Sequence, residues 1–200
     1  MPVFNTDTQA PDIKTATHAH APELAYLVNL AGEGLPYYLW SQTAEPGQSP
    51  FEVGRQRACR EAGGFSYRNA YVIEQAGRAI ATVIGYRQPD AFDPAEWADV
   101  PAPVLPLLEL EAHAPRSWYL NVLATFKEQR GNGYGTTLML FSEKLALDAE
   151  CREISLIVAE HNLARKLYEK LGYRANASRP IVQYEGCEQE GNWILMVKSL

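Results

Sequence analysis

Glycines recur at alternate positions in the segment Arg130-Gly131-Asn132-Gly133-Tyr134-Gly135. Because glycine has no Cβ atom, it adopts positive φ angles and lets the backbone approach a ligand closely. The segment lies between a strand-like run and a helix-like run, so its amides are expected to point outward, unpaired, from a helix N-terminus, where they and the helix dipole favour an anion. Arg130 adds a planar cation beside them. The segment therefore predicts a phosphate or pyrophosphate site.

The glycine spacing does not match two common nucleotide-binding motifs. A Walker loop requires lysine and then Ser or Thr after its last glycine, whereas Gly135 is followed by Thr136 and Thr137. A dinucleotide fingerprint requires glycines at its first, third and sixth places, and counted from Gly131 the sixth place is Thr136. From this segment alone, a glycine turn with a purely structural role stays open beside the anion site.

A second motif follows the next strand-like run, where residues 162–173 read Asn-Leu-Ala-Arg-Lys-Leu-Tyr-Glu-Lys-Leu-Gly-Tyr. Together with the Arg-x-x-Gly-x-Gly loop, a long helix and a strand in that order, this motif resembles the GNAT superfamily of acyl-CoA-dependent acetyltransferases. The resemblance covers residues 118–174 in detail and the earlier helices and hairpin more loosely. It implies acetyl-CoA as the acyl-donor cosubstrate and an amine as the acceptor.

The resemblance also implies roles for particular residues. In this family a strand splays from its neighbour before the glycine loop, and the exposed backbone pairs with the pantetheine arm and holds the thioester carbonyl. Tyr168 corresponds to the tyrosine that protonates the departing thiolate, so it is the implied catalytic residue. Asn162 corresponds to a position that contacts the cofactor or orders the nearby loop. The implied cofactor-binding residues are Leu123, Ala124, Thr125, Arg130, Gly131, Asn132, Gly133, Tyr134, Gly135, Thr136 and Asn162.

Simpler explanations exist for these residues when each is taken alone. Tyr168 shares a predicted inward helix face with Ala164 and Leu171, which is typical of a core tyrosine. Asn162 occupies a position where helix N-caps are common, and Arg130 could be a surface charge. The complete motif favours a functional Tyr168. During amine attack on a thioester, backbone amides stabilise the oxyanion, and a phenol near the sulfur donates a proton.

The sequence shows no evident general base. Acidic and histidine side chains precede the central strand and follow the next one, but each is better explained as a surface or structural residue. These candidates are Glu109, Glu111, His113, Glu160 and His161. The four histidines have no metal-ligand spacing, so we predict no metal.

The central strand at residues 117–125 shows an alternating pattern. Trp118, Leu120 and Val122 are expected on one face, and Tyr119, Asn121 and Leu123 on the other. We expect Tyr119 and Asn121 to line the cleft.

The elements that position these residues form a mixed series of helices and strands. The first half predicts a strand at 13–17, a helix from Pro22 to Ala31 ended by Gly32 and Gly34, a polar helix at 52–62, and a hairpin of strands 70–74 and 78–86. After the central strand, the second half predicts a helix at 133–149, a strand at 154–158, a helix at 164–171 and strands at 173–176 and 193–198.

Strands joined by helices are usually parallel, whereas a hairpin is antiparallel. We therefore predict an α/β (α+β) fold: a single GNAT-like domain with a central mixed, mostly antiparallel sheet, a splayed parallel strand pair, and helices on both faces. Residues 88–115 contain six prolines, which block both ladders and helix interiors. We predict that they form an insertion or lid, with a helical turn at 105–110, in a domain of residues 1–200.

The composition is that of an ordinary globular protein, with 200 residues, 46% hydrophobic residues and 21% charged residues. A net charge of −6 argues against nucleic-acid binding through a basic face and mildly favours a cationic partner, although such a charge often serves only solubility. The three cysteines are widely spaced, and residues 1–12 lack the pattern of a signal peptide. No run approaches the ~20 apolar residues of a membrane span. We expect a cytoplasmic protein that binds no membrane.

Taken together, the sequence predicts an N-acetyltransferase that transfers an acetyl group from acetyl-CoA to a primary amine by direct attack in a ternary complex. The acceptor is a small molecule or a protein amine. The alternative is a non-catalytic acyl-CoA-binding regulatory module that keeps the pyrophosphate loop without turnover. A homodimer is compatible with the family resemblance.

Overall fold

The computed structural model describes residues 11–200. The prediction that residues 1–12 carry no signal peptide therefore falls mostly outside the described residues. The strands are β1 (Ile13–Thr15), β2 (Ala70–Gln75), β3 (Arg78–Arg87), β4 (Trp118–Thr125), β5 (Glu153–Ala159), β6 (Arg174–Pro180) and β7 (Asn192–Ser199). The α-helices are α1 (Ala21–Ala31), α2 (Leu35–Ser41), α3 (Pro50–Ala58), α4 (Leu105–Glu111), α5 (Tyr134–Asp148) and α6 (Arg165–Lys170).

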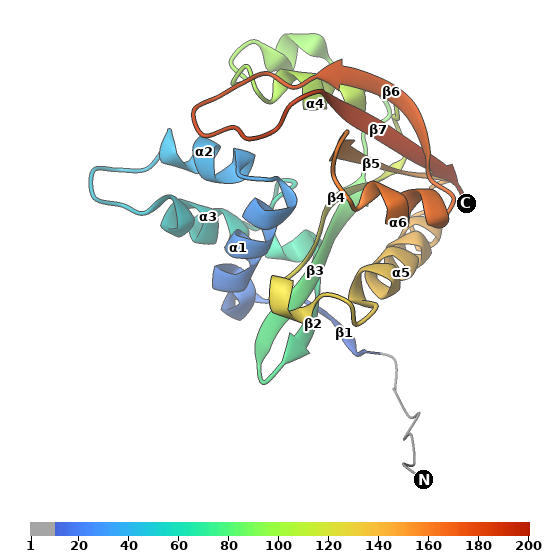
Figure 1. The fold of residues 1–200 in the computed structure, drawn as a ribbon, viewed down its shortest axis with the longest axis horizontal. Helices are drawn as coiled ribbons and strands as arrows, with labels where there is room; N and C mark the ends of the chain where they lie inside the picture. Colours follow the sequence, from blue (N-terminus) through green and yellow to red (C-terminus); the bar gives the residue numbers. More distant parts are fainter. Residues whose placement is uncertain (1–10) are drawn as a thin grey trace.

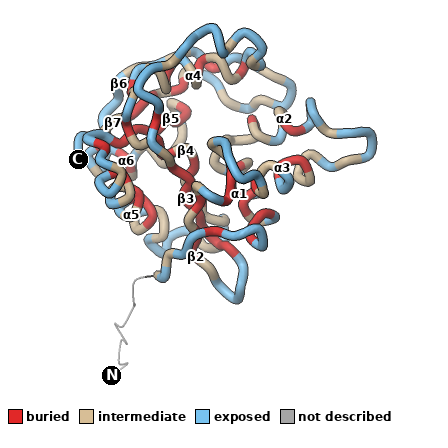
Figure 2. The backbone as a smooth tube through the Cα atoms, turned by 180° about the vertical axis from the view of Figure 1, so that it is seen from behind, coloured by how far each residue is buried: buried red, intermediate tan, exposed pale blue. Residues whose placement is uncertain are grey.

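The strands form one seven-stranded sheet in the order β1-β2-β3-β4-β5-β7-β6 (Figure 1). The β4–β5 pair is parallel, and the other neighbouring pairs are antiparallel. Helices α5 and α6 cover one face, while α1, α3 and α4 lie against the other. Figure 2 shows that the buried positions follow the sheet and the helix sides turned toward it. The predicted mixed sheet with a parallel pair and helices on both faces is confirmed.

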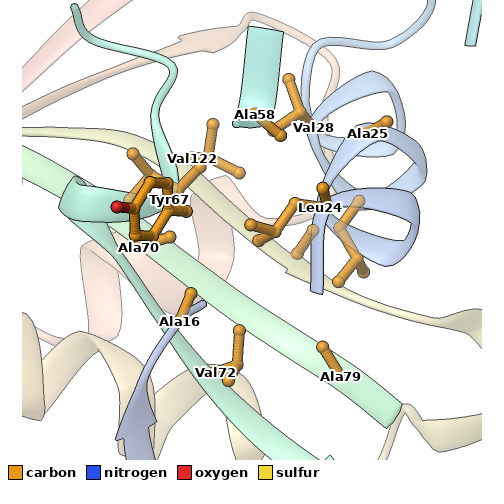
Figure 3. Close-up of a cluster of buried hydrophobic side chains, with 14 of the residues drawn as sticks. Ala16, Leu24, Ala25, Val28, Ala58, Tyr67, Ala70, Val72, Ala79 and Val122 are labelled. Carbon is orange, nitrogen blue, oxygen red and sulfur yellow. The ribbon is translucent and has the colours of Figure 1, made fainter. Parts of the chain in front are cut away.

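Helix α1 forms where the sequence predicts it. Pro22 occupies the first turn, where a missing amide costs nothing, and the helix ends at Gly32. Its apolar positions Leu24, Leu27 and Val28 are buried in one cluster with residues of β2, β3 and β4, part of which Figure 3 shows. This packing fixes the C-terminal end of α1 beside the central strands.

Helix α2 was not predicted. Pro36 reads as a residue beyond a helix end, but it lies in the first turn of a new helix that begins after the left-handed Gly34. Trp40 then buries its ring against Gly54 of α3, where an added Cβ would lie 2.6 Å from the ring. Helix α3 also begins at Pro50 and ends at Ala58, earlier than the predicted range of 52–62. The formation of α2 and the early start of α3 both arise because proline suits the first turn of a helix.

The predicted alternation along β4 is wrong after Leu120. Val122 pairs with Ile84, and Leu120 pairs with the next residue, Gly85, so Asn121 is an extra residue with no partner in the β3 register. Such a bulge reverses the faces of the residues that follow it. Val122 therefore packs in the cluster with α1, whereas Leu123 packs on the α5 side.

The proline-rich segment contains a short 3-10 helix at Pro94–Trp97 and helix α4, which confirms the predicted helical turn. Leu110 of α4 is fully buried in a cluster with residues of β5, β6 and β7. That residues 88–115 are an insertion in a domain of residues 1–200 stays a prediction. Among residues 11–200, none of the helices has the length and apolar character that crossing a membrane requires.

The parallel pair is closed at one end by two buried serines. Ser117 Oγ donates to the carbonyl of Ala114 at 2.7 Å, and it lies 2.7 Å from Ser155 Oγ. Both serines have almost no exposed surface. Buried hydroxyl groups need partners, so this contact fastens the start of β4 to β5.

We expect Ser117→Ala to lower the free energy of unfolding by about 1–3 kcal/mol, because it leaves the Ser155 hydroxyl buried without its partner and removes one of the two hydrogen bonds to the Ala114 carbonyl. The double variant Ser117→Ala/Ser155→Ala should cost less than the two single changes added together. Denaturant unfolding measures these values, with the exposed Ser199→Ala as a control expected within about 0.5 kcal/mol of the native protein. Strictly additive costs would show that the two hydroxyl groups do not interact.

Candidate active site

The central cleft forms where β4 and β5 part. The strands pair in register only at Trp118–Ile154 and Tyr119–Ser155. Beyond these pairs β4 continues along β3 to Thr125, and β5 continues along β7. A cleft of about 570 Å³ opens between them. Its lining comes from β4, β5, β7, the glycine turn, α6, and the end of α1 with the residues that follow it.

The glycine turn lies at one end of this cleft. Gly131 and Gly133 have φ angles of 85° and 80°, and Gly133 is the N-cap of α5. The amides of residues 131–136 donate no hydrogen bond within the described part of the chain, and the first amide with a partner is that of Thr137, which donates to the Gly133 carbonyl at 3.0 Å. The first turn of α5 has no acidic residue. These free donors at a helix N-terminus suit a phosphate group.

Most of the predicted cofactor-binding residues line this single cleft. They are Leu123, Ala124, Thr125, Arg130, Gly131, Gly133, Tyr134, Gly135 and Asn162. Arg130 Nε lies 3.3 Å from the Thr125 carbonyl, so the guanidinium sits between the end of β4 and the turn. Asn132 and Thr136 do not belong to the lining. The Asn132 side chain donates to the Gln129 carbonyl at 2.9 Å, and Thr136 is exposed on the first turn of α5.

Tyr168 projects from α6 into the same cleft and is 6% exposed. Burial, with a further contribution from the negative charge of Glu33, raises the pKa of Tyr168 to about 12. The hydroxyl therefore keeps its proton at neutral pH. Tyr168 is buried among apolar residues, as a core tyrosine is, and it also lines the cleft. Its role as the proton donor stays a prediction.

Asn162 connects two parts of the chain that are far apart in sequence. Its Oδ1 accepts the amide of Ala164 at 2.8 Å, which caps the turn into α6. Its Nδ2 donates to Glu33 Oε1 at 2.6 Å. The Asn162 side chain therefore closes the turn that precedes α6, whose N-cap is Ala164, and it also holds Glu33 in the loop that follows α1.

Glu33 is a cleft residue that the sequence analysis did not single out. It lies between Gly32 and Gly34, directly after α1, and has a positive φ of 51°. Burial raises its pKa, and the hydrogen bond from Asn162 opposes that rise. A charged residue between two glycines at a helix end is the signal that could have identified it.

None of the five base candidates lines this cleft. Glu160 accepts both the amide and the side chain of Asn192, which lowers its pKa. Glu109 forms an ion pair with Arg179. The two histidine candidates also lie outside the cleft. His113 Nε2 lies 3.2 Å from Arg179 Nη2, and His161 is exposed. The positions of these four residues agree with the surface or structural roles expected for them.

The fifth candidate, Glu111, belongs to a separate buried group. It accepts a hydrogen bond from Gln88 at 2.7 Å, and burial raises its pKa. Tyr119 is buried beside it, and burial together with the Glu111 charge raises the pKa of Tyr119. The expectation that Tyr119 lines the cleft is therefore wrong, whereas Asn121 does line it. The bulge at Asn121 separates the two side chains.

Comparisons with known proteins agree with this geometry. A model of the acetyltransferase (GNAT) family matches residues 36–173. An N-acetyltransferase from Staphylococcus aureus has a similar structure, with a TM-score of 0.60 at 18% identity over 94% of this chain and 100% of that one. A polyamine N-acetyltransferase from Drosophila melanogaster has a TM-score of 0.62 at 16% identity over 94% and 100% of the two chains. A search of curated protein sequences found no match.

A CoA-bound structure is also similar. The NatC complex bound to Gag peptide and CoA contains a chain with a TM-score of 0.54 at 16% identity, over 94% of this chain and 98% of that one. The fold is that of a GNAT acetyltransferase. The chain belongs to the GNAT family of acetyltransferases.

We expect Gly133→Ala to weaken CoA binding by about tenfold, equal to about 1.4 kcal/mol, because the methyl group strains the turn and enters the space in front of its amides. Gly186→Ala is the matched control, since both glycines have a φ of 80° and no atom near the added Cβ. Each change should cost about 1–2 kcal/mol of stability. Calorimetric titration with CoA measures the affinity, and an equal affinity in both variants would exclude the turn as the binding site.

Proposed function

We propose that this protein transfers an acetyl group from acetyl-CoA to a primary amine by direct attack in a ternary complex. One observation supports this most strongly: a single cleft between the parted strands has free amides at one end and the protonated hydroxyl of Tyr168 within it. Diphosphate binding and thiolate protonation are both required in acetyl transfer from CoA, and a purely structural glycine turn requires neither.

The elements around the cleft suit the successive parts of the donor. We assign the diphosphate to the amides of residues 131–136 with Arg130 beside them, and the pantetheine arm to the edge of β4 at Leu123, Ala124 and Thr125. The parted edge of β4 has no ladder partner on this side, so its backbone groups are available to the amides of the arm. Asn132 and Thr136 border the turn from outside the cleft, and their contact with the donor stays a prediction.

The chemistry follows from this placement. The amine nitrogen attacks the thioester carbonyl carbon, a C–N bond forms, and the C–S bond breaks. Backbone amides of the parted strand stabilise the oxyanion. Tyr168 donates its proton to the departing sulfur, and the phenolate regains a proton from the nitrogen of the new amide. Placing both reactants in one cleft supplies much of the rate enhancement.

A primary amine is the acceptor class that the similar structures support. The Drosophila polyamine N-acetyltransferase catalyses the formation of N-acetylagmatine. The free hydroxyl of Tyr168 favours turnover over the non-catalytic binding module. A homodimer and a cytoplasmic location stay predictions.

Binding of the donor is the first test. Acetyl-CoA at about 100 times its Kd should stabilise the folded protein by about 2.7 kcal/mol, because the ligand binds only the folded state. A thermal-shift titration measures the rise in Tm. The absence of a shift at millimolar acetyl-CoA would overturn both the acetyltransferase and the non-catalytic binding module.

Turnover is the second test, and Tyr168→Phe probes it. The variant should lower kcat by about 10²-fold, because a positioned general acid contributes about 10²–10⁴-fold, while the affinity for acetyl-CoA changes little. Tyr173→Phe is a matched control, since Tyr173 is buried beside Tyr168, with ring centroids 6.2 Å apart, but does not line the cleft. Release of free CoA with a panel of primary amines measures the rate. An unchanged kcat with chemistry rate-limiting would remove the acid role.

A further inference from the structure

The backbone at Glu33 holds its side chain in an uncommon arrangement. A positive φ is rare for residues other than glycine and persists where the surrounding structure enforces it. Here Gly32 and Gly34 flank the residue, and an added Cβ at Gly32 would lie 2.5 Å from the Pro36 ring. The turn between α1 and α2 is therefore tightly packed, and Glu33 turns toward the cleft from it.

The Glu33 carboxylate is only partly satisfied. Oε1 accepts the hydrogen bond from Asn162, whereas Oε2 is buried without a hydrogen-bond partner among the described residues. No arginine, lysine or histidine within residues 11–200 forms an ion pair with it. A buried carboxylate without a cation is costly, so the site favours a positively charged ligand group.

The groups that face Glu33 can accommodate such a ligand. Burial raises the pKa values of Tyr168 on α6 and of Tyr184 in the connection between β6 and β7, and the negative charge of Glu33 adds to both rises. Trp193 lines the same cleft, and Tyr38 packs against Tyr184 with ring centroids 4.8 Å apart. The rings of Tyr168 and Trp193, which line the cleft with Glu33, can attract an ammonium group through cation–π interaction.

We propose that Glu33 binds the ammonium group of the acceptor through Oε2 and removes its proton, so that the acceptor enters the cleft as a cationic amine. This proposal rests on the proposed acetyl transfer. Asn162 is then a positioning residue, because it holds the other carboxylate oxygen and fixes the direction of Oε2.

The need for a base follows from amine chemistry. An alkylammonium group has a pKa near that of lysine, about 10.4, so only about one molecule in a thousand is neutral and nucleophilic at neutral pH. The ammonium N–H bond breaks, its electron pair stays on nitrogen, and the proton forms an O–H bond with Glu33. Nitrogen then attacks the thioester carbonyl, and Glu33 later releases the proton to water. The five other base candidates lie outside the cleft.

Glu33→Gln removes the charge while preserving the shape and an oxygen for Asn162. We expect kcat/KM at neutral pH to fall by about 10²-fold or more for the panel amine that the native enzyme acetylates fastest. The affinity for acetyl-CoA should stay within about twofold of the native value. Glu45→Gln, at an exposed position, controls for the lost charge and should match the native enzyme.

The pH profile separates chemistry from a structural effect. Without the base, kcat/KM should rise with pH until the amine loses its own proton, so the defect of Glu33→Gln shrinks at alkaline pH. Tyr168 and Tyr184, whose pKa values burial raises, keep their protons through this range. A purely structural defect would instead lower the rate by one factor at every pH.

Other results would overturn the proposal. Unchanged kcat/KM in Glu33→Gln would exclude the base, and a matching loss of acetyl-CoA affinity would make Glu33 a donor-binding or structural residue. A native enzyme that binds acetyl-CoA but acetylates no cationic amine of the panel would exclude the acceptor class. These outcomes differ from failure of the proposed function, in which the native protein does not bind acetyl-CoA at all.

Discussion

The parting of β4 and β5 is the constraint on which the rest of the structure depends. Backbone N–H and C=O groups in a protein interior require partners, and two neighbouring strands normally provide them for each other. Here the strands stay paired only near Trp118 and Tyr119, with the Ser117–Ser155 contact at the closed end. Beyond that point the edge of β4 that faces β5 lacks ladder partners, so a ligand with amide and carbonyl groups can take the place of a strand.

Two helix ends place chemically different groups in different parts of this cleft. The N-terminus of α5 supplies unpaired amides, which attract an anion. The turn after the C-terminus of α1 supplies Glu33, whose oxygen Oε2 has no hydrogen-bond partner among residues 11–200 and is the proposed site for the acceptor ammonium group. Asn162 connects this turn to α6, which carries Tyr168. In the proposed function, the diphosphate of the donor and the ammonium group of the acceptor therefore bind different parts of one cleft.

Local signals predicted much of this architecture. The structure confirms the elements whose sequence signals are local. These are the hairpin of β2 and β3, helix α1, the strand–turn–helix around Gly133, and the segment 162–173. Helix α2 and the faces of β4 were missed or wrong. Pro36 is compatible with both the end of one helix and the start of the next. No local sequence pattern predicts the bulge at Asn121. Tertiary packing decided both.

The sequence by itself determined the glycine turn, the tyrosine-bearing helix and the family to which they belong, because each depends on short-range spacing. Only the tertiary structure decided that Glu33 meets Asn162, 129 positions away along the chain, and that its other oxygen has no hydrogen-bond partner within residues 11–200. It also separated Tyr119 from the cleft. Contacts between distant segments depend on how helices pack across a sheet, and a single sequence carries no local pattern for them.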